Sequence, residues 1–202
     1  GRYGCEECND GKNVKLDQQH VSMILIHRVG HEVGSDAATI SSWYQTTCKK
    51  HTGGQMPYSF VNTRHRLEQA LPLAERGVHA RAFGNSHSIG FAQVGDFNRH
   101  APPLSQWKRA VEFAAMLVPF LSRHLATTMW VLPSHLRYTI PVFGHGEIPA
   151  TFSAGTQKEQ PNGKFACPGA NWDMNLFRQH VQRALKYRAT AGLHELGVQV
   201  EL

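Results

Sequence analysis

Long apolar runs are missing from this sequence of 202 residues. A membrane-spanning helix needs about 20 predominantly apolar residues. The longest candidate, from Ala114 to Leu121, is much shorter and contains Pro119. No secretory leader is visible at the N-terminus, although a chain that begins at Gly1 could have lost one by processing. We therefore expect a globular protein without a membrane span.

Cysteine is also scarce, with four residues in the chain. Cys5 and Cys8 form a CxxC motif, but no second CxxC completes a structural zinc site. A local disulfide, a free dithiol and a partial metal site all remain open for this pair. If Cys167 is a metal ligand, the other three cannot all pair within one chain. The cysteine pattern then argues against a disulfide-stapled secreted scaffold.

Blocks of lysine and arginine are absent, although the chain is basic, with a formal net charge of +6 and a pI of about 9.3. A basic surface attracts polyanions in general, which include nucleic acids and the anionic polymers of bacterial walls. No recognised nucleic-acid-binding motif accompanies the charge. Hydrophobic residues make up 41% and charged residues 18%, a composition typical of a globular domain.

Apolar periodicity predicts strands interspersed with helices. Strands are expected at residues 21–27, 58–63, 67–71, 88–94 and 138–143, the second and third forming a hairpin with a basic turn at 62–66. Helices are expected at 37–51 with a cap at Ser35 or Asp36, at 105–124 with a kink or early end at Pro119, and from 172 to 188. The segment from Pro72 to Ser86 is expected to be loop. The pattern predicts an α/β fold, a central mixed β-sheet flanked by helices in a single domain.

Two histidines and one cysteine carry metal-binding chemistry at informative places. An apolar run ends in His27, as it would if a buried strand delivered a side chain into a cleft. His145 lies in a Gly-rich segment that follows a predicted strand, and Cys167 lies in a later loop. Two imidazoles and a thiolate suit zinc, and three protein ligands leave the fourth position for water, as in catalytic sites. Spacing alone leaves ordinary buried or surface roles open for each residue.

Six short motifs, in one order along the chain, resemble those of the zinc-dependent N-acetylmuramoyl-L-alanine amidase family, which includes phage endolysins and peptidoglycan recognition proteins. The resemblance runs from about Val21 to about Arg188. The motifs are Ile26-His27, Tyr58-Ser59-Phe60-Val61, Gly77-Val78-His79-Ala80, Asn85-Ser86-His87-Ser88-Ile89-Gly90, Gly144-His145-Gly146-Glu147-Ile148 and Cys167-Pro168-Gly169.

The resemblance implies an enzyme that cleaves the amide bond between N-acetylmuramic acid and the L-alanine of the stem peptide. It implies Zn2+ as cofactor, with His27, His145 and Cys167 as ligands. Tyr58 and Lys164 are the implied catalytic helpers, which stabilise the oxyanion. Lys164 lies three residues before the last ligand, whereas phage-type relatives carry a lysine two residues before it.

Other positions of the motifs imply supporting roles. His79 and Asn85 match residues that line the substrate groove. Glu147 is expected to orient a metal ligand without binding the metal itself. Some bacterial relatives carry a glutamate where this chain has Ala92, so a general-base glutamate is not expected on that strand. The expected division is an N-terminal extension at 1–20, a zinc amidase domain at 21–188 and a C-terminal tail at 189–202.

The expected biology follows the same resemblance. We expect a peptidoglycan substrate, action on the bacterial cell wall in phage lysis or wall turnover, no nucleic-acid partner, and a monomer. The enzyme would reach the wall from a host cytoplasm or as a secreted protein whose leader has been removed. A non-catalytic peptidoglycan-binding module on the same fold is the first alternative, and a basic nucleic-acid or regulatory binding protein is the second. Cys167 favours the enzyme, since recognition-type relatives that lose this ligand also lose catalysis.

Overall fold

The computed structural model describes residues 21–29, 36–47, 56–121, 140–148 and 167–195. A five-stranded sheet with the order β3-β2-β4-β1-β5 forms its centre. The strands are β1 (Met23–Val29), β2 (Phe60–Asn62), β3 (Leu67–Gln69), β4 (Ser88–Val94) and β5 (Val142–Gly144). All neighbours run parallel except β2 and β3, which form an antiparallel hairpin. The predicted mixed sheet is therefore confirmed.

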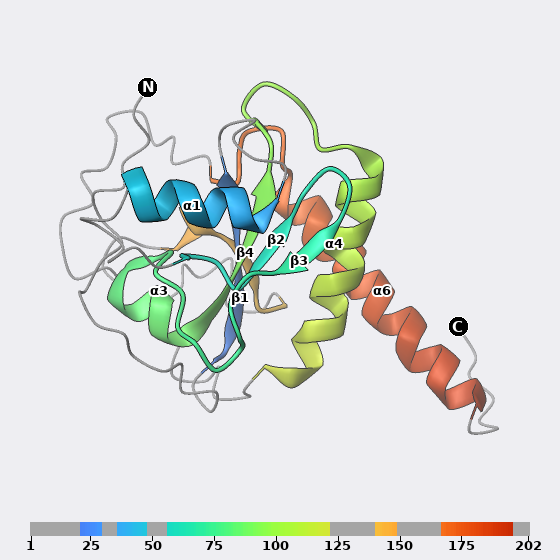
Figure 1. Cartoon of the computed structure of the whole chain (residues 1–202). Coiled ribbons are helices and arrows are strands. Elements are labelled where there is room, and N and C mark those ends of the chain that lie inside the picture. Colours follow the sequence, from blue (N-terminus) through green and yellow to red (C-terminus); the bar gives the residue numbers. More distant parts are fainter. Residues whose placement is uncertain (1–20, 30–35, 48–55, 122–139, 149–166, 196–202) are drawn as a thin grey trace.

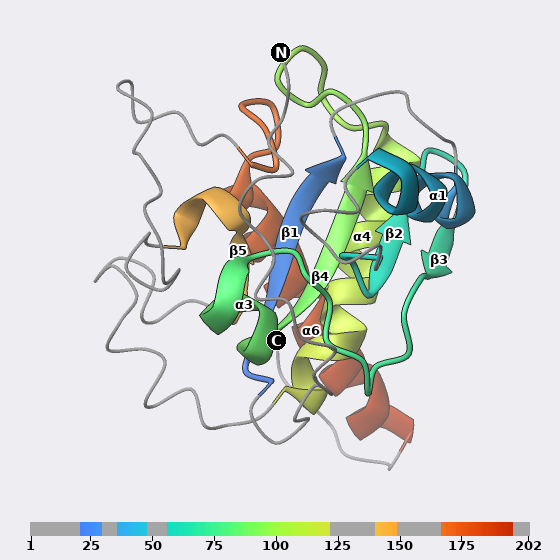
Figure 2. The same ribbon diagram turned by 60° about the vertical axis from the view of Figure 1, so that its left-hand side comes forward.

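Helices cover both faces of the sheet (Figures 1 and 2). The α-helices α1 (Ala37–Thr47) and α3 (Arg81–His87) lie on one face. On the other face lie α4 (Leu104–Leu117), its 3-10 continuation η2 (Val118–Phe120), and α6 (Met174–Glu195). Pro119 falls in η2, so α4 ends early, as the sequence predicts.

The alternation of side chains along β1 separates these two faces. Ile24 and Ile26 pack in the main core against residues of α4 and α6. Met23 and Leu25 point the other way and pack with Ala80 and Phe143. Because successive strand residues face opposite sides, His27 belongs to the same face as Met23 and Leu25. The main core thus closes one face, and the other face receives the histidine.

Two sequence predictions of secondary structure are wrong. The segment expected to be loop from Pro72 to Ser86 contains most of α3. This helix is short and contains Gly84 and Asn85, which favour turns, so local propensity gave no helical signal. The last helix continues past Arg188 to Glu195, into the expected tail. The residues that follow Arg188 are Ala189-Thr190-Ala191-Gly192, which carry no large apolar side chain, so no apolar periodicity marked this part of the helix.

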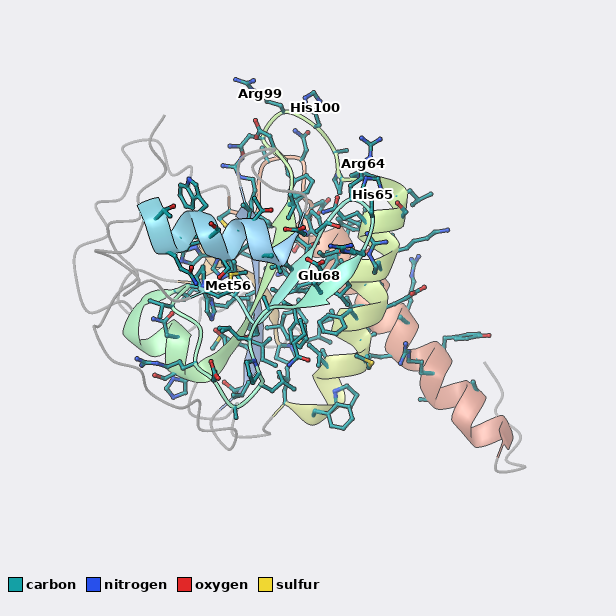
Figure 3. All side chains as sticks on the ribbon, viewed as in Figure 1. Met56, Arg64, His65, Glu68, Arg99 and His100 are labelled. Atoms are coloured by element: carbon teal, nitrogen blue, oxygen red, sulfur yellow. The ribbon has the colours of Figure 1, made fainter. Side chains whose placement is uncertain are left out.

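Exposed basic side chains gather where β2 and β4 end. Arg64 and His65 lie on the turn after β2, and Arg99 and His100 lie on the loop after β4 (Figure 3). Since β2 and β4 are parallel, both loops leave the same edge of the sheet. The predicted basic turn is therefore exposed. No helix within the described ranges is long and apolar enough to cross a membrane.

Candidate functional site

Three segments that are distant in sequence bring His27, His145 and Cys167 together. His27 comes from the central strand β1 and is 2% exposed. His145 opens the 3-10 helix η4 (His145–Glu147), which follows β5 directly. Because β5 pairs with β1 up to Gly144, His145 emerges beside His27. One ligand atom from each of the three residues lies within 4.8 Å of the other two, so the group could hold a metal ion.

Close backbone packing brings Cys167 to the two histidines. The Gly146 amide donates a hydrogen bond to the Cys167 carbonyl oxygen at 2.9 Å. A Cβ atom on Gly144 would lie 3.0 Å from that carbonyl oxygen and from Pro168 Cδ. Gly169 has a φ of +138°, and a Cβ there would lie 2.7 Å from backbone and side-chain atoms of Phe97. Glycine at 144 therefore permits the close approach of the Cys167 segment to β5, and glycine at 169 lets that segment pack against Phe97.

The surroundings of Cys167 combine burial with nearby positive charge. Burial raises the pKa of the Cys167 thiol to about 11, while a hydrogen bond from the Arg28 amide and the charge of Arg28 act in the opposite direction. That amide donates to Cys167 Sγ at 3.4 Å, and the Arg28 guanidinium pairs with Asp96 at 3.0 Å. A bound cation would reverse the effect of burial, since thiolate is the form that ligates metals.

His27 is held in its neutral form. Burial lowers the pKa of His27 well below its ordinary value, and the charges of His145 and His79 act in the same direction. A neutral imidazole is the form that ligates a metal. The site is therefore prepared, at the position of His27, to accept a cation rather than a proton.

His79 supports His27 from inside the protein. Its Nδ1 lies 2.8 Å from His27 Nε2, in a buried hydrogen bond between the two rings. Gly90 on β4 provides the space, because a Cβ atom there would lie 2.8 Å from two carbons of the His79 ring. Burial and then the charge of His145 lower the pKa of His79 to about 3, against a backbone hydrogen bond with Ser88.

Asn85 fixes the backbone that carries His79. Its Oδ1 accepts hydrogen bonds from the amides of His79 and Ala80, at 2.8 and 2.7 Å. Both side chains were expected in the substrate groove, yet Asn85 is 0% exposed and His79 is 3% exposed. His79 contacts the His27 ring, and Asn85 contacts the backbone that carries His79. Direct contact of either with a substrate stays a prediction.

Tyr58 lies beside the candidate ligands, just before β2. Its side chain is 7% exposed, and its ring is tilted against that of His27 with centroids 5.3 Å apart. The hydroxyl lies 3.1 Å from the hydroxyl of Tyr44 on α1. Tyr44 was not among the site residues expected from the sequence. The contact between two hydroxyls has no signature in the sequence, because it depends on how α1 lies over the sheet.

Glu147 holds the turn that carries His145. Its carboxylate accepts a hydrogen bond from the Gly144 amide at 2.8 Å and pairs with both terminal nitrogens of Arg178, at 2.7 and 3.0 Å. Arg178 is buried on α6, and its guanidinium also donates to the Val142 carbonyl oxygen at 3.3 Å. Glu147 can therefore support His145 through its hydrogen bond to the backbone at Gly144. Sequence analysis missed Arg178, the partner that makes this possible.

Lys164, the second expected catalytic residue, lies outside the described residues. Its distance from the three candidate ligands, and the role that the motif implies for it, stay a prediction.

Comparison with known proteins places this arrangement in context. Residues 17–169 match the family model Amidase_2, described as N-acetylmuramoyl-L-alanine amidase. A search of curated proteins finds no match. Among solved structures, the N-acetylmuramoyl-L-alanine amidase LysC from Clostridium intestinale URNW is similar, with a TM-score of 0.57, 17% identity, and coverage of 87% of this chain and 95% of that one.

Two further structures show the range of this fold. The Ph2119 endolysin from the Thermus scotoductus MAT2119 bacteriophage Ph2119 matches with a TM-score of 0.52 and 17% identity, over 89% of this chain and 92% of its own. Bumblebee PGRP-SA matches with a TM-score of 0.50 and 18% identity, over 74% of this chain and 85% of its own. At these identities the likeness shows the fold, which amidases and recognition proteins share.

Proposed function

Because the chain belongs to the N-acetylmuramoyl-L-alanine amidase family, we propose that it is a zinc-dependent peptidoglycan hydrolase. It cleaves the amide bond between N-acetylmuramic acid and the L-alanine of the stem peptide. The observation that carries the proposal is the convergence of His27, His145 and Cys167, whose ligand atoms lie within 4.8 Å of one another. The proposed setting is the bacterial cell wall, in phage lysis or wall turnover.

The donor set supports zinc as the metal. Two imidazoles and one thiolate match the ligand types of catalytic zinc sites, in which three protein ligands leave one position open. Bound zinc supplies an activated water and polarises the carbonyl that is attacked. The protein contributes a buried, neutral His27 and an Arg28 amide that donates to the thiol sulfur. These two features favour ligation of a cation.

Tyr58 is the proposed hydrogen-bond donor to the carbonyl oxygen as negative charge develops on it. Its support is its place against the His27 ring and its hydroxyl, which can donate a hydrogen bond. Burial of most of the side chain restricts its rotamers, so the hydroxyl is placed before substrate binds. Lys164 is proposed as a second source of positive charge, on the motif alone.

Glu147, His79 and Asn85 are proposed as positioning residues. Glu147 holds the backbone turn before His145, through Gly144 and Arg178. His79 bonds to the His27 ring, and Asn85 bonds to the backbone at His79. We assign the amidase domain to residues from about 21 onward and extend it, with α6, to Glu195.

Digestion of purified peptidoglycan tests the activity and the bond together. The zinc-loaded protein should release stem peptides with a free L-alanine amine and leave the glycan strands uncut, as judged by mass spectrometry. Cys167→Ala should abolish release, and Tyr187→Phe, at an exposed site on α6, should leave it unchanged. New reducing ends without new amines would show a glycosidase instead. Binding to peptidoglycan without any cleavage would support the alternative of a recognition module. Bumblebee PGRP-SA has a similar fold.

A further inference from the structure

We propose that Tyr44 is a positioning residue of this site, whose hydroxyl orients the hydroxyl of Tyr58. The inference rests on the proposed function, because it concerns the group that would donate to the oxyanion. The two hydroxyl oxygens are hydrogen-bonded at 3.1 Å, slightly longer than the usual O–H···O distance. The rings meet edge to face, with centroids 6.0 Å apart and planes at 83°.

The position of Tyr44 follows from the way α1 is fixed to the sheet. The Asp36 carboxylate caps the helix by accepting the Thr39 amide at 2.8 Å. The Ala37 amide donates to Glu68 on β3, which attaches the first turn of α1 to the sheet edge. Ile40 is buried beside Tyr58, and Tyr44 lies four residues further along the same helix face. The helix therefore presents Tyr44 to Tyr58 rather than to solvent.

A second aromatic ring backs Tyr44. The Trp43 ring lies edge to face with it, with centroids 5.0 Å apart and planes at 86°. A sequence of ring contacts thus runs from Trp43 through Tyr44 and Tyr58 to His27. Packing of this kind fixes the direction of the Tyr44 Cζ–Oη bond, because each ring limits the rotation of the next.

Hydroxyl chemistry indicates what the contact does. A phenol carries one hydrogen and can also accept hydrogen bonds. When Tyr44 donates to the Tyr58 oxygen, Tyr58 directs its own hydrogen to another acceptor, and its polarity as a donor increases because hydrogen bonds in a chain reinforce one another. In the proposed reaction that acceptor is the developing oxyanion. Tyr44 itself does not touch the reacting atoms.

A double-mutant cycle with Tyr44→Phe, Tyr58→Phe and the double variant tests the coupling. Tyr58→Phe should lower kcat at least about tenfold, as loss of one oxyanion donor does. Tyr44→Phe should lower kcat about three- to tenfold with KM and zinc content unchanged, since it removes orientation alone. The double variant should be no slower than Tyr58→Phe. Multiplying losses, or wild-type kcat in Tyr44→Phe, would overturn the proposal.

Fluorine NMR of the metal-free protein provides a readout that does not depend on activity. The five tyrosines of the chain would be replaced by 3-fluorotyrosine. Tyr44→Phe should remove one resonance and shift that of Tyr58, whereas Tyr187→Phe, at a side chain that is 76% exposed, should only remove its own. An unmoved Tyr58 resonance would contradict the contact. If the wild-type protein cleaves nothing, the proposed function fails, while the fluorine spectra still decide the Tyr44–Tyr58 contact.

Discussion

Cys167 decides the chemistry of the candidate metal centre at the scale of single residues. Its sulfur lies among two imidazoles, and the Arg28 amide already donates to it at 3.4 Å. A thiol with a pKa raised to about 11 by burial stays protonated at neutral pH without a cation beside it. The residue is therefore a half-buried, protonated thiol without metal, and it would become a thiolate if a cation bound beside it.

Replacement of the ligands should change the zinc content. We expect about one zinc per wild-type chain, measured by inductively coupled plasma mass spectrometry, and loss of activity with a strong chelator. His27→Ala and Cys167→Ala should each lower the zinc content, because each removes one of three donors. His100→Ala, at an exposed loop residue, is the control. Full zinc retention in both ligand variants would rule the site out.

Gly90 is a second residue on which the site depends. A Cβ atom at this position would lie 2.8 Å from two carbons of the His79 ring. Gly90→Ala should therefore displace that ring, weaken zinc binding, and lower the free energy of unfolding by about 1–3 kcal/mol, the usual cost of overpacking.

His79→Ala supplies the control for this displacement. His79→Ala removes the ring that the new methyl group would meet. In the His79→Ala background, Gly90→Ala should therefore lower the free energy of unfolding only slightly further. Equal costs of Gly90→Ala in the two backgrounds, by thermal unfolding, would show that the glycine serves another purpose.

At the scale of elements, α6 holds the 3-10 turn η4 where it follows β5. Arg178 of α6 binds both carboxylate oxygens of Glu147, whose Oε2 also accepts the Gly144 amide. The helix therefore fixes the segment from which His145 projects, although it lies on the opposite face of the sheet from α1 and α3.

Arg178→Met should loosen this turn. It removes two charge-assisted hydrogen bonds from Glu147, each of which typically stabilises by about 1.5–3 kcal/mol. We expect a lower unfolding midpoint and weaker zinc binding, measured by calorimetric titration of the metal-free protein. Arg188→Met, on the exposed end of the same helix, should change neither. Zinc affinity equal to wild type in Arg178→Met would show that the turn holds its shape without the ion pair.

At the scale of the whole molecule, the buried histidines couple folding to pH. Burial and the charge of His145 lower the pKa of His79 to about 3, and the pKa of His27 is lowered as well. Unfolded histidine titrates near about 6.5. Below that pH these histidines bind protons in the unfolded chain but stay neutral in the folded chain. The free energy of unfolding therefore falls as pH decreases.

The metal-free protein should therefore lose thermal stability as pH falls from about 6.5 towards the folded pKa of His79, and keep this contribution above about 6.5. His79→Gln should make the slope of the unfolding midpoint against pH shallower, because one buried titratable group is gone. His100→Gln is the matched surface control. An identical slope in wild type and His79→Gln would contradict the assignment.

Local sequence determined many of the elements of this protein and its candidate metal donors. The apolar run before His27, the hairpin, and the Pro119 break are properties of neighbouring residues, and the fold confirms each of them. The order of six motifs likewise indicated the family that the comparison of residues 17–169 now shows. Side-chain type alone singled out two imidazoles and one thiol as metal donors.

The tertiary structure alone decided which side chains meet. The contacts of Tyr44 with Tyr58, His79 with His27, and Glu147 with Arg178 join separate elements. Each depends on strand order and on a register in which a shift by one residue would turn every side chain to the other face. The helix α3 also depends on such packing, because Gly84 and Asn85 favour turns in isolation. Short-range patterns carry no information about which side chains lie close together across a sheet. The supporting residues of the site are defined by contacts of that kind.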